Sequence, residues 1–210
     1  MNLDRLKGLY VITDDVLTPT ESVVQQIKKA LDSGAKIVQL RDKTSSDEQI
    51  AKTALVLNEV CKEYGALFVL NDKVDIAIEL GLSGLHIGKS DHHRVKEIRK
   101  NFDGCIGVSC YEDIALAKQM QEVGVDYVAF GSFYVSPTKP KANIVELDIL
   151  SQAKKELDIP VCAIGGINQE NINEVMKHNP DMISLVSDIW RSEDIEAKSR
   201  FYANLYEDVQ

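Results

Sequence analysis

Residues 9–40 read LYVITDDVLTPTESVVQQIKKALDSGAKIVQL, and this stretch indicates the fold of the whole chain. It begins with a short β-branched run, Leu9 to Thr13, and ends with a second one, Ile37 to Leu40. Between them, Glu21 to Leu31 carries apolar residues three to four positions apart, which is the period of a helix that buries one face. Strand, helix and strand in this order form a βαβ unit, so the stretch predicts a parallel sheet.

The same alternation continues along the rest of the chain. Further strand candidates are Leu67 to Leu70, Gly84 to Ile87, Cys105 to Val108, Tyr127 to Phe130, Val161 to Ile164 and Met182 to Val186. Helical periodicity recurs in Gln49 to Cys61, Ile114 to Val123 and Ile149 to Leu157. Eight near-regular units predict an α/β fold, a single-domain (β/α)8 TIM barrel over residues 1–210, because doubly wound open sheets usually have fewer strands and a Gly-rich first turn. Since about 250 residues is typical of this fold, the chain is expected to be a short-loop variant.

Composition excludes several classes of function. The net charge of −9 gives no electrostatic support for binding nucleic acid or an anionic membrane. No apolar run is long enough to span a membrane, and the N-terminus lacks a basic region followed by an apolar one. The four cysteines form no CxxC pair, which favours buried, reduced thiols. We therefore expect a cytoplasmic protein whose partners are small molecules, with a homo-oligomer left open.

One loop is expected to be longer than the other connections. Gly131 to Ile144 reads GSFYVSPTKPKANI, which is long for a connection between a strand and its helix. This length predicts an active-site lid, and the alternative is an irregular surface loop.

Polar residues at the predicted strand ends are the candidates for chemistry, because active sites of such barrels lie there. Gln39, Arg41 and Lys43 alternate, so their side chains can point to one side of an extended strand end. Converging cations favour an anionic ligand, and an Arg fork suits phosphate oxygens. The alternative is that Arg41 and Lys43 only pair with nearby acids such as Asp42 or Asp47.

Two carboxylates follow neighbouring strands. Asp72 comes after Asn71 at the end of one strand, and Asp91 follows the next strand by a few residues. Such a pair suits Mg²⁺, which commonly takes one or two carboxylates together with waters and substrate phosphates. General acid–base catalysis by these two carboxylates is less favoured, since adjacent cations would keep both groups ionised. The structural alternative makes each Asp an N-cap of the helix that follows.

A phosphate site is expected at the last two strands. Gly165 and Gly166 allow a close backbone approach, and backbone amides near Val186 and Ser187 complete the phosphate cup that is usual in this fold. The alternative is that the two glycines only turn the chain.

Histidine and cysteine chemistry is not favoured. His86 lies in an alternating strand and is expected to be a hydrogen-bonded interior side chain, while His92 and His93 have no partners at metal-ligand spacing. Cys110 has no evident His or acid partner, so nucleophilic catalysis is a weak hypothesis.

Taken together, the segments LYVITD, VQLRDK, LFVLNDKVDIA, GLHIGKSD, IGVSCY, DYVAFGSFYVSPTKPKA and VCAIGGI resemble the thiamine-phosphate synthase family, in order and over essentially the whole chain. The resemblance implies a (β/α)8 transferase that joins a pyrimidine diphosphate to a thiazole phosphate and releases pyrophosphate. In such enzymes the diphosphate is thought to leave first, and the thiazole nitrogen then captures the pyrimidine carbocation. Stabilising a leaving anion requires cations and metal rather than a strong base.

The resemblance also implies a role for each candidate. The pyrimidine diphosphate is expected to contact Gln39, Arg41, Lys43, Asn71, Ser109 and Lys139, of which Arg41, Lys43, Ser109 and Lys139 are the predicted catalytic residues. Mg²⁺ is expected on Asp72 and Asp91. The thiazole phosphate is expected to contact Ser136, Thr138, Gly165, Gly166, Val186 and Ser187.

The chain departs from the family pattern at four positions. Lys89 replaces a glutamine near the predicted metal, Ser136 replaces a threonine, Tyr111 replaces a histidine, and Asp188 lies close to the phosphate cup. These changes affect fine contacts rather than the reaction class. Two alternatives remain: a thiazole tautomerase, which needs no diphosphate-binding residues, and a barrel that binds a phosphate ligand without catalysis.

Overall fold

The computed structural model describes residues 6–136 and 143–207, and they form a closed parallel barrel. Its strands are β1 Gly8–Ile12, β2 Ile37–Leu40, β3 Leu67–Asn71, β4 Gly84–Ile87, β5 Cys105–Tyr111, β6 Tyr127–Phe130, β7 Val161–Ile164 and β8 Met182–Leu185. Each strand pairs with the next in sequence, and β8 closes the barrel by pairing in parallel with β1. The predicted TIM barrel is therefore confirmed.

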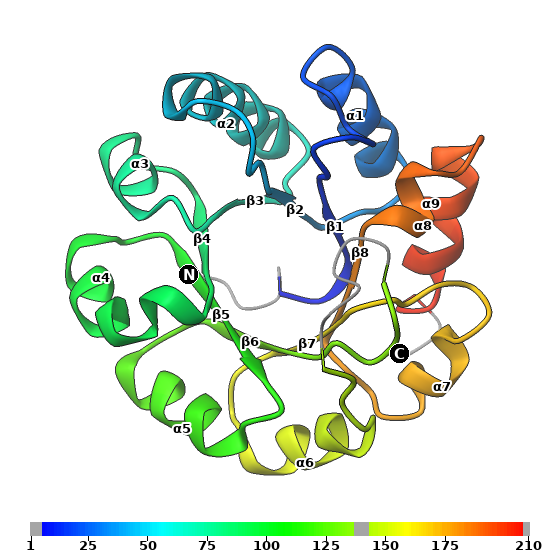
Figure 1. Cartoon of the computed structure of the whole chain (residues 1–210). Helices are drawn as coiled ribbons and strands as arrows, with labels where there is room; N and C mark the ends of the chain where they lie inside the picture. Colours follow the sequence, from blue (N-terminus) through cyan, green and yellow to red (C-terminus); the bar gives the residue numbers. More distant parts are fainter. Residues whose placement is uncertain (1–5, 137–142, 208–210) are drawn as a thin grey trace.

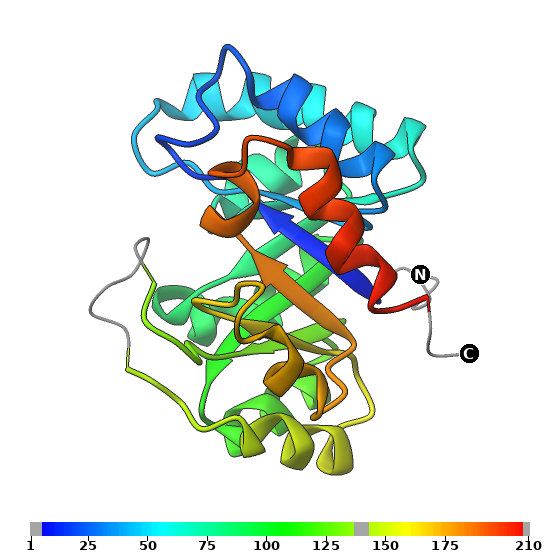
Figure 2. The ribbon, with the colours of Figure 1, turned by 90° about the vertical axis from the view of Figure 1, so that its right-hand side faces the viewer.

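Helices surround the barrel on the outside, as the view along its axis shows (Figure 1). They are α1 Val23–Asp32, α2 Asp47–Glu63, α3 Val74–Glu79, α4 Val95–Asn101, α5 Ile114–Val123, α6 Asp148–Glu156, α7 Ile172–Met176, α8 Ser187–Trp190 and α9 Ile195–Asn204. A 3₁₀ helix, η2 Lys89–Arg94, precedes α4. In a view at right angles, the arrowheads of β1 and β8 point to the side of the barrel where α8 lies (Figure 2).

Four predicted strands need corrected bounds. The first runs from Gly8 to Ile12 rather than from Leu9 to Thr13, the third ends at Asn71 rather than Leu70, and the eighth ends at Leu185 rather than Val186. The fifth continues past Val108 to Tyr111, with an irregular register against β6 between Ser109 and Tyr111. Apolar runs locate a strand, but hydrogen bonding to the neighbouring strand decides where it ends.

Alternation along the strands creates two separate cores. Leu9 and Val11 belong to the large core between strands and helices, whereas Tyr10 and Ile12 belong to a smaller core inside the barrel. The inner core consists of Leu6, Tyr10, Ile12, Ile37, Leu67, Val69, Cys105, Tyr127, Ala129, Cys162 and Met182. All four cysteines are free and buried, as expected for thiols without a disulfide or metal role. Among the described residues no helix is long and apolar enough to cross a membrane.

Candidate active site

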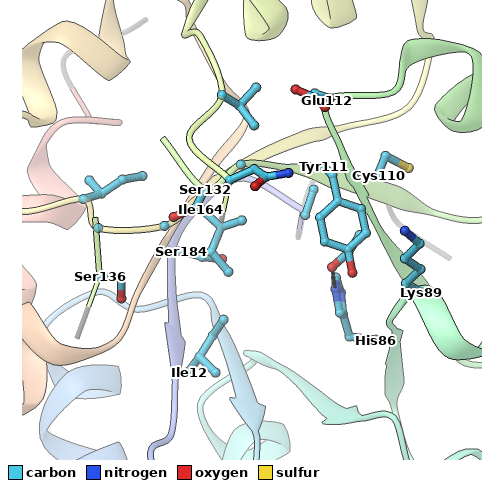
Figure 3. A pocket seen from close by; sticks show the side chains of 18 of the residues that line it. Ile12, His86, Lys89, Cys110, Tyr111, Glu112, Ser132, Ser136, Ile164 and Ser184 are labelled. Atoms are coloured by element: carbon cyan, nitrogen blue, oxygen red, sulfur yellow. Dashed lines mark hydrogen bonds between the residues drawn. The ribbon is translucent and has the colours of Figure 1, made fainter. Parts of the chain in front are cut away.

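A cavity of about 850 Å³ opens at the carboxyl ends of the strands, where barrel chemistry is expected. Its lining includes most of the predicted substrate-binding residues: Gln39, Arg41, Asn71, Ser109, Ser136, Gly165, Gly166, Val186 and Ser187. Figure 3 shows His86 and Lys89 on one side of this pocket and Ser132 and Ser136 on the opposite side. Residues far apart in the sequence therefore meet around one space.

Five predicted residues are not among the described residues that line this cavity. Lys43, Asp72 and Asp91 lie outside its lining. Thr138 and Lys139 fall in residues 137–142, which are outside the described residues, as is the middle of the predicted lid. Their assignments remain predictions.

The acids suggested as partners for Arg41 and Lys43 are engaged elsewhere. The Asp42 carboxylate accepts hydrogen bonds from the backbone N–H groups of Thr44 and Ser45, each at 2.9 Å. Asp47 instead pairs with Lys73, at 2.6 Å between Nζ and Oδ1. Partial burial raises the pKa of Asp42, but the hydrogen bonds from its own loop outweigh that effect and lower the pKa overall. Neither acid therefore pairs with Arg41 or Lys43 among the described contacts.

Lys43 pairs instead with Asp72, with 2.5 Å between its Nζ and Oδ2. The same carboxylate accepts hydrogen bonds from Asn71 Nδ2 at 2.8 Å and from the Gly88 N–H at 3.1 Å. Partial burial raises the pKa of Asp72, yet Lys43, Gly88 and Asn71 together lower it below its usual value. Asp72 is therefore ionised at neutral pH, and it does not cap α3, whose N-terminus has no side-chain cap.

Asp91 lies in η2 and is also held as a carboxylate. Its Oδ2 accepts a hydrogen bond from Ser90 at 2.8 Å, and its Oδ1 accepts one from Arg94 at 3.0 Å. The Ser90 hydrogen bond is the main cause of its lowered pKa, while the charge of Asp72 acts in the opposite direction. No side chain caps the N-terminus of α4, so Asp91 is not a cap of that helix.

Two ionised carboxylates near each other fit a hard divalent cation. Among the described residues there is no group of three or more His, Cys, Asp or Glu side chains that could hold a metal by itself. Mg²⁺ suits such a site, because it keeps waters and takes oxygens from a phosphorylated substrate. Asp72 and Asp91 therefore fit a Mg²⁺ ion whose remaining ligands would be waters and substrate oxygens.

The two glycines after β7 have a packing role as well as a conformational one. Gly165 and Gly166 have φ values of 106° and 67°, which disfavour any residue with a side chain. A Cβ atom on Gly165 would lie 2.1 Å from the Ser132 Oγ, and one on Gly166 would lie 2.6 Å from the Tyr134 carbonyl oxygen. Turning is therefore only part of their role, since the segment after β6 packs directly against them.

Helix α8 is fixed at the mouth of the barrel. Trp190 donates a hydrogen bond from Nε1 to the carbonyl oxygen of Ile12 at 2.6 Å, which ties α8 to the end of β1. Asp188 accepts a hydrogen bond from the Tyr202 hydroxyl at 2.5 Å and lies 3.5 Å from Lys198 Nζ, both on α9. Tyr202 and Lys198 therefore stabilise the Asp188 carboxylate.

Several known proteins are similar to this chain in sequence and in fold. Residues 9–189 match the family model described as thiamine monophosphate synthase. A thiamine-phosphate synthase of Thioalkalivibrio sulfidiphilus is 38% identical, over 97% of this chain and 97% of its own length. That of Wolinella succinogenes is 41% identical, over 89% and 86%. The structure of a thiamine phosphate pyrophosphorylase from Pyrococcus furiosus has a TM-score of 0.86 and 32% identity, covering 99% of both chains.

The chain belongs to the thiamine monophosphate synthase family. Because the homology extends over essentially the whole chain, the predicted thiamine-phosphate synthase activity, a transferase activity of thiamine biosynthesis, is confirmed, and so is the resemblance.

One group of residues at the cavity was not predicted from the sequence to have a functional role. His86 is a hydrogen-bonded interior side chain, as predicted, but it also lines the cavity and contacts the predicted catalytic Ser109 at 2.8 Å. Its other ring nitrogen lies 2.9 Å from the Tyr127 hydroxyl, which lies 2.8 Å from that of Tyr10. Tyr10 and Tyr127 were missed because each stands in an apolar strand. Their inward position in the alternation was the available signal.

Cys110 lines the cavity without being suited to nucleophilic chemistry. Burial raises the pKa of its thiol to about 12, so the thiolate is not formed at neutral pH. The neighbouring Tyr111, where the family pattern has histidine, adopts a positive φ of 59° and also lines the cavity. The His92 ring lies 6.5 Å from that of Tyr111, and its pKa is lowered, chiefly by burial. A histidine is therefore present near this position, although it comes from η2.

Proposed function

We propose that this barrel transfers a hydroxymethylpyrimidine group from its diphosphate to the nitrogen of hydroxyethylthiazole phosphate, in a Mg²⁺-dependent reaction. The products are thiamine phosphate and pyrophosphate, and pyrophosphate leaves before the new C–N bond forms. The observation that carries this proposal is a large cavity lined by Arg41, whose guanidinium has no hydrogen-bond or ion-pair partner among the described residues. The carboxylates Asp72 and Asp91, both with lowered pKa values, follow β3 and β4.

Arg41 is the side chain best suited to the diphosphate. It lines the cavity, and its guanidinium has no hydrogen-bond or ion-pair partner among the described residues. A guanidinium can donate two parallel hydrogen bonds to phosphate oxygens, and these strengthen as negative charge develops on the leaving group. Lys43, two residues further along, adds a second charge, and the resemblance to the family implies the same role for Lys139.

Asp72 and Asp91 would hold Mg²⁺ at this edge. When bound, the ion neutralises charge on the departing pyrophosphate. Lys43 now neutralises Asp72, so it must give up part of that contact when a cation binds the carboxylate. Asn71 and Gly88 keep the Asp72 carboxylate oriented through their hydrogen bonds.

The remaining predicted residues divide between the two heterocycles. Gln39, Asn71 and Ser109 line the cavity on β2, β3 and β5, and we assign the pyrimidine to them. Ser136, the Gly165–Gly166 turn and the backbone at Val186 and Ser187 also line this cavity, and we assign them, with Thr138, to the thiazole phosphate. The two groups of residues lie around one cavity, as a direct transfer between two bound substrates requires.

Two observations disfavour the alternatives. A thiazole tautomerase has no use for the diphosphate-binding residues, whereas this chain keeps Arg41, Lys43, Asp72 and Asp91 in an ionised cluster at one edge. A barrel that only binds a phosphate ligand would need no carboxylate pair beside that phosphate, because like charges repel.

The reaction needs only small phosphorylated heterocycles and Mg²⁺ as partners. We place it in the cytoplasm, with no nucleic acid or membrane as partner, and a homo-oligomer is compatible with it.

The test is an assay of the purified protein with both heterocyclic phosphates, with and without Mg²⁺. We expect thiamine phosphate and pyrophosphate in equal amounts, and only when the metal is present. Absence of both products with all components present would contradict the proposal. Isomerisation of a thiazole carboxylate phosphate alone would favour the tautomerase, and tight binding without turnover would favour the non-catalytic barrel.

A further inference from the structure

Five side chains form a continuous hydrogen-bonded chain across the inside of the barrel, here called the relay. Gln39 Nε2 donates to the Tyr10 hydroxyl at 2.6 Å, and the Tyr10 and Tyr127 hydroxyls are 2.8 Å apart. Tyr127 lies 2.9 Å from His86 Nδ1, and His86 Nε2 lies 2.8 Å from Ser109 Oγ. Both ends of the relay, Gln39 and Ser109, line the cavity and belong to the residues proposed to bind the pyrimidine.

The relay is enclosed by the apolar inner core. Tyr10 and Tyr127 are 1% and 0% exposed, so neither hydroxyl can replace a lost partner with water. Burial raises the pKa of both tyrosines, which keeps them protonated. An unsatisfied hydroxyl in such surroundings is costly, so the relay must be satisfied as a unit.

A glycine makes room for the central tyrosine. A Cβ atom on Gly107 would lie 1.9 Å from Cζ of Tyr127 and 2.4 Å from its hydroxyl oxygen. The two residues are register partners on β5 and β6. Gly107 has no positive φ to explain it, so its lack of a side chain serves the position of Tyr127.

With a neutral His86, counting donors leaves two arrangements in which both tyrosine hydroxyl protons are used. In the first, Gln39 donates to Tyr10, Tyr10 to Tyr127, Tyr127 to His86, and His86 to Ser109. Gln39 can then offer a ligand its Oε1 acceptor and its second Nε2 hydrogen, and Ser109 can offer its hydroxyl proton. In the second, every hydrogen bond is reversed, so Gln39 can offer a ligand only N–H donors and Ser109 only acceptor lone pairs. The Gln39 amide has its Nε2 toward Tyr10, which selects the first arrangement.

We infer that Tyr10, Tyr127 and His86 are positioning residues that couple the two ends of the relay, so that Gln39 presents an acceptor and Ser109 a donor at the same time. This inference rests on the proposed function, because it concerns the pyrimidine of that reaction. A ring that complements this pattern offers a donor toward Gln39 and an acceptor toward Ser109. An amino-substituted pyrimidine does so through its amino group and a ring nitrogen. An oxo-substituted pyrimidine presents an acceptor in place of the amino group, and two acceptors then face each other at Gln39.

Tyr127, which does not line the cavity, thus determines specificity through the two ends of the relay. Reversing it to suit an oxo-pyrimidine requires the Gln39 amide to turn and the tautomer of His86 to change together with both tyrosine hydroxyls. Removing one hydroxyl from the middle separates the two ends, and each end can then adapt to the ligand independently.

The experiment compares wild type with Tyr127→Phe, and uses Tyr206→Phe as the matched control. Tyr206 is partly buried, and its hydroxyl donates to the Pro180 carbonyl oxygen at 3.3 Å, outside the relay. For each protein, kcat/KM is measured with the amino-pyrimidine diphosphate and with its oxo analogue, at saturating thiazole phosphate and Mg²⁺. We expect Tyr127→Phe to reduce the discrimination ratio by about tenfold, the equivalent of roughly 1.4 kcal/mol for one misdirected hydrogen bond.

The loss should appear mainly in KM for the pyrimidine substrate, with inhibition by pyrophosphate unchanged, because pyrophosphate contacts the cations rather than the relay. Tyr10→Phe interrupts the relay at another point and should lower the ratio in the same way, which covers the case in which Tyr127→Phe fails to fold. Tyr206→Phe should keep the wild-type ratio.

Two results would overturn the inference: a wild-type protein that accepts both pyrimidines equally, or relay variants that are folded and active with the wild-type ratio. A wild-type protein that forms no thiamine phosphate would contradict the proposed function instead. In that event, the relay is still tested by calorimetric affinities for the two pyrimidine diphosphates, with the same expected loss of preference.

Discussion

Two regions at the cavity, here called the edge and the floor, differ in solvent exposure and in charge. The edge, formed by Arg41, Lys43, Asp72 and Asp91, has partly exposed side chains; Lys43 and Asp72 are 44% and 27% exposed. The floor is the relay, whose tyrosines are buried, neutral and surrounded by apolar residues. Charges at the edge can exchange partners when an anion or a metal binds, whereas the floor can change only as a whole. The edge therefore suits the chemistry of a leaving anion, and the floor suits recognition of an uncharged ring.

The largest expected effect comes from removing the Arg41 guanidinium, which has no ion-pair partner among the described residues. Arg41→Ala should lower kcat by about 10² or more, the usual scale for deleting a group that stabilises transition-state charge. Steady-state kinetics with both substrates and Mg²⁺ measures it. Arg41→Lys is the matched control, since it keeps the charge but loses the two-pronged geometry, and it should recover only part of the rate. A kcat within twofold of wild type for Arg41→Ala would remove Arg41 from the catalytic residues.

The next effect concerns the two carboxylates. Asp72→Asn and Asp91→Asn should each raise the Mg²⁺ concentration for half-maximal activity, by roughly tenfold or more if these groups are ligands. Asp47→Asn is the control, because Asp47 is an exposed acid of the same region that pairs only with Lys73. Metal titrations of activity give the answer. If both variants keep the wild-type metal dependence, the metal site lies elsewhere.

A smaller effect, on stability alone, is expected at the floor. Tyr10→Phe removes the partner of Gln39 and Tyr127, and we expect it to lower the free energy of unfolding by about 1–2 kcal/mol. Because no charge is involved, the loss should be the same at low and high salt. Urea unfolding at two salt concentrations measures it, and a strong salt dependence would show that the floor is not electrostatically separate from the edge.

The contrast between edge and floor also explains what the sequence could reveal. Alternating strand and helix patterns predicted all eight strands and the closed barrel, because each unit must bury its apolar face. Charged residues at strand ends, such as Arg41 and Asp72, are conspicuous against apolar runs, so the edge could be predicted. Tyr10 and Tyr127 could not be separated from ordinary core residues, since hydrogen bonding across the barrel depends on side-chain directions from strands that lie 117 positions apart.

The partners of the charged side chains could not be predicted from the sequence either. Lys43 has several acids within a few positions, yet its partner is Asp72, 29 positions away. Closure of the barrel brings β2 and β3 side by side, and it decides which charges meet. Asp188 is a similar case, because its nearness to the phosphate cup in sequence does not reveal that Tyr202 and Lys198 hold its carboxylate.

The smallest expected effect is a pH dependence that belongs to the edge and not to the floor. Although burial raises the pKa of Asp72, Lys43 and two hydrogen bonds lower it overall, so the native carboxylate holds its proton less tightly than the unfolded one. Its contribution to stability is therefore complete above the usual carboxyl pKa of about 3.9 and is lost as pH falls through the native pKa. Exposure and salt screening limit the contribution to less than about 1 kcal/mol. Asp72→Asn should thus be slightly less stable than wild type at pH 6, and the difference in urea midpoint should shrink as the pH is lowered below about 3.9. A difference that does not change with pH would mean that the hydrogen bonds of Asp72, rather than its ion pair with Lys43, stabilise this region.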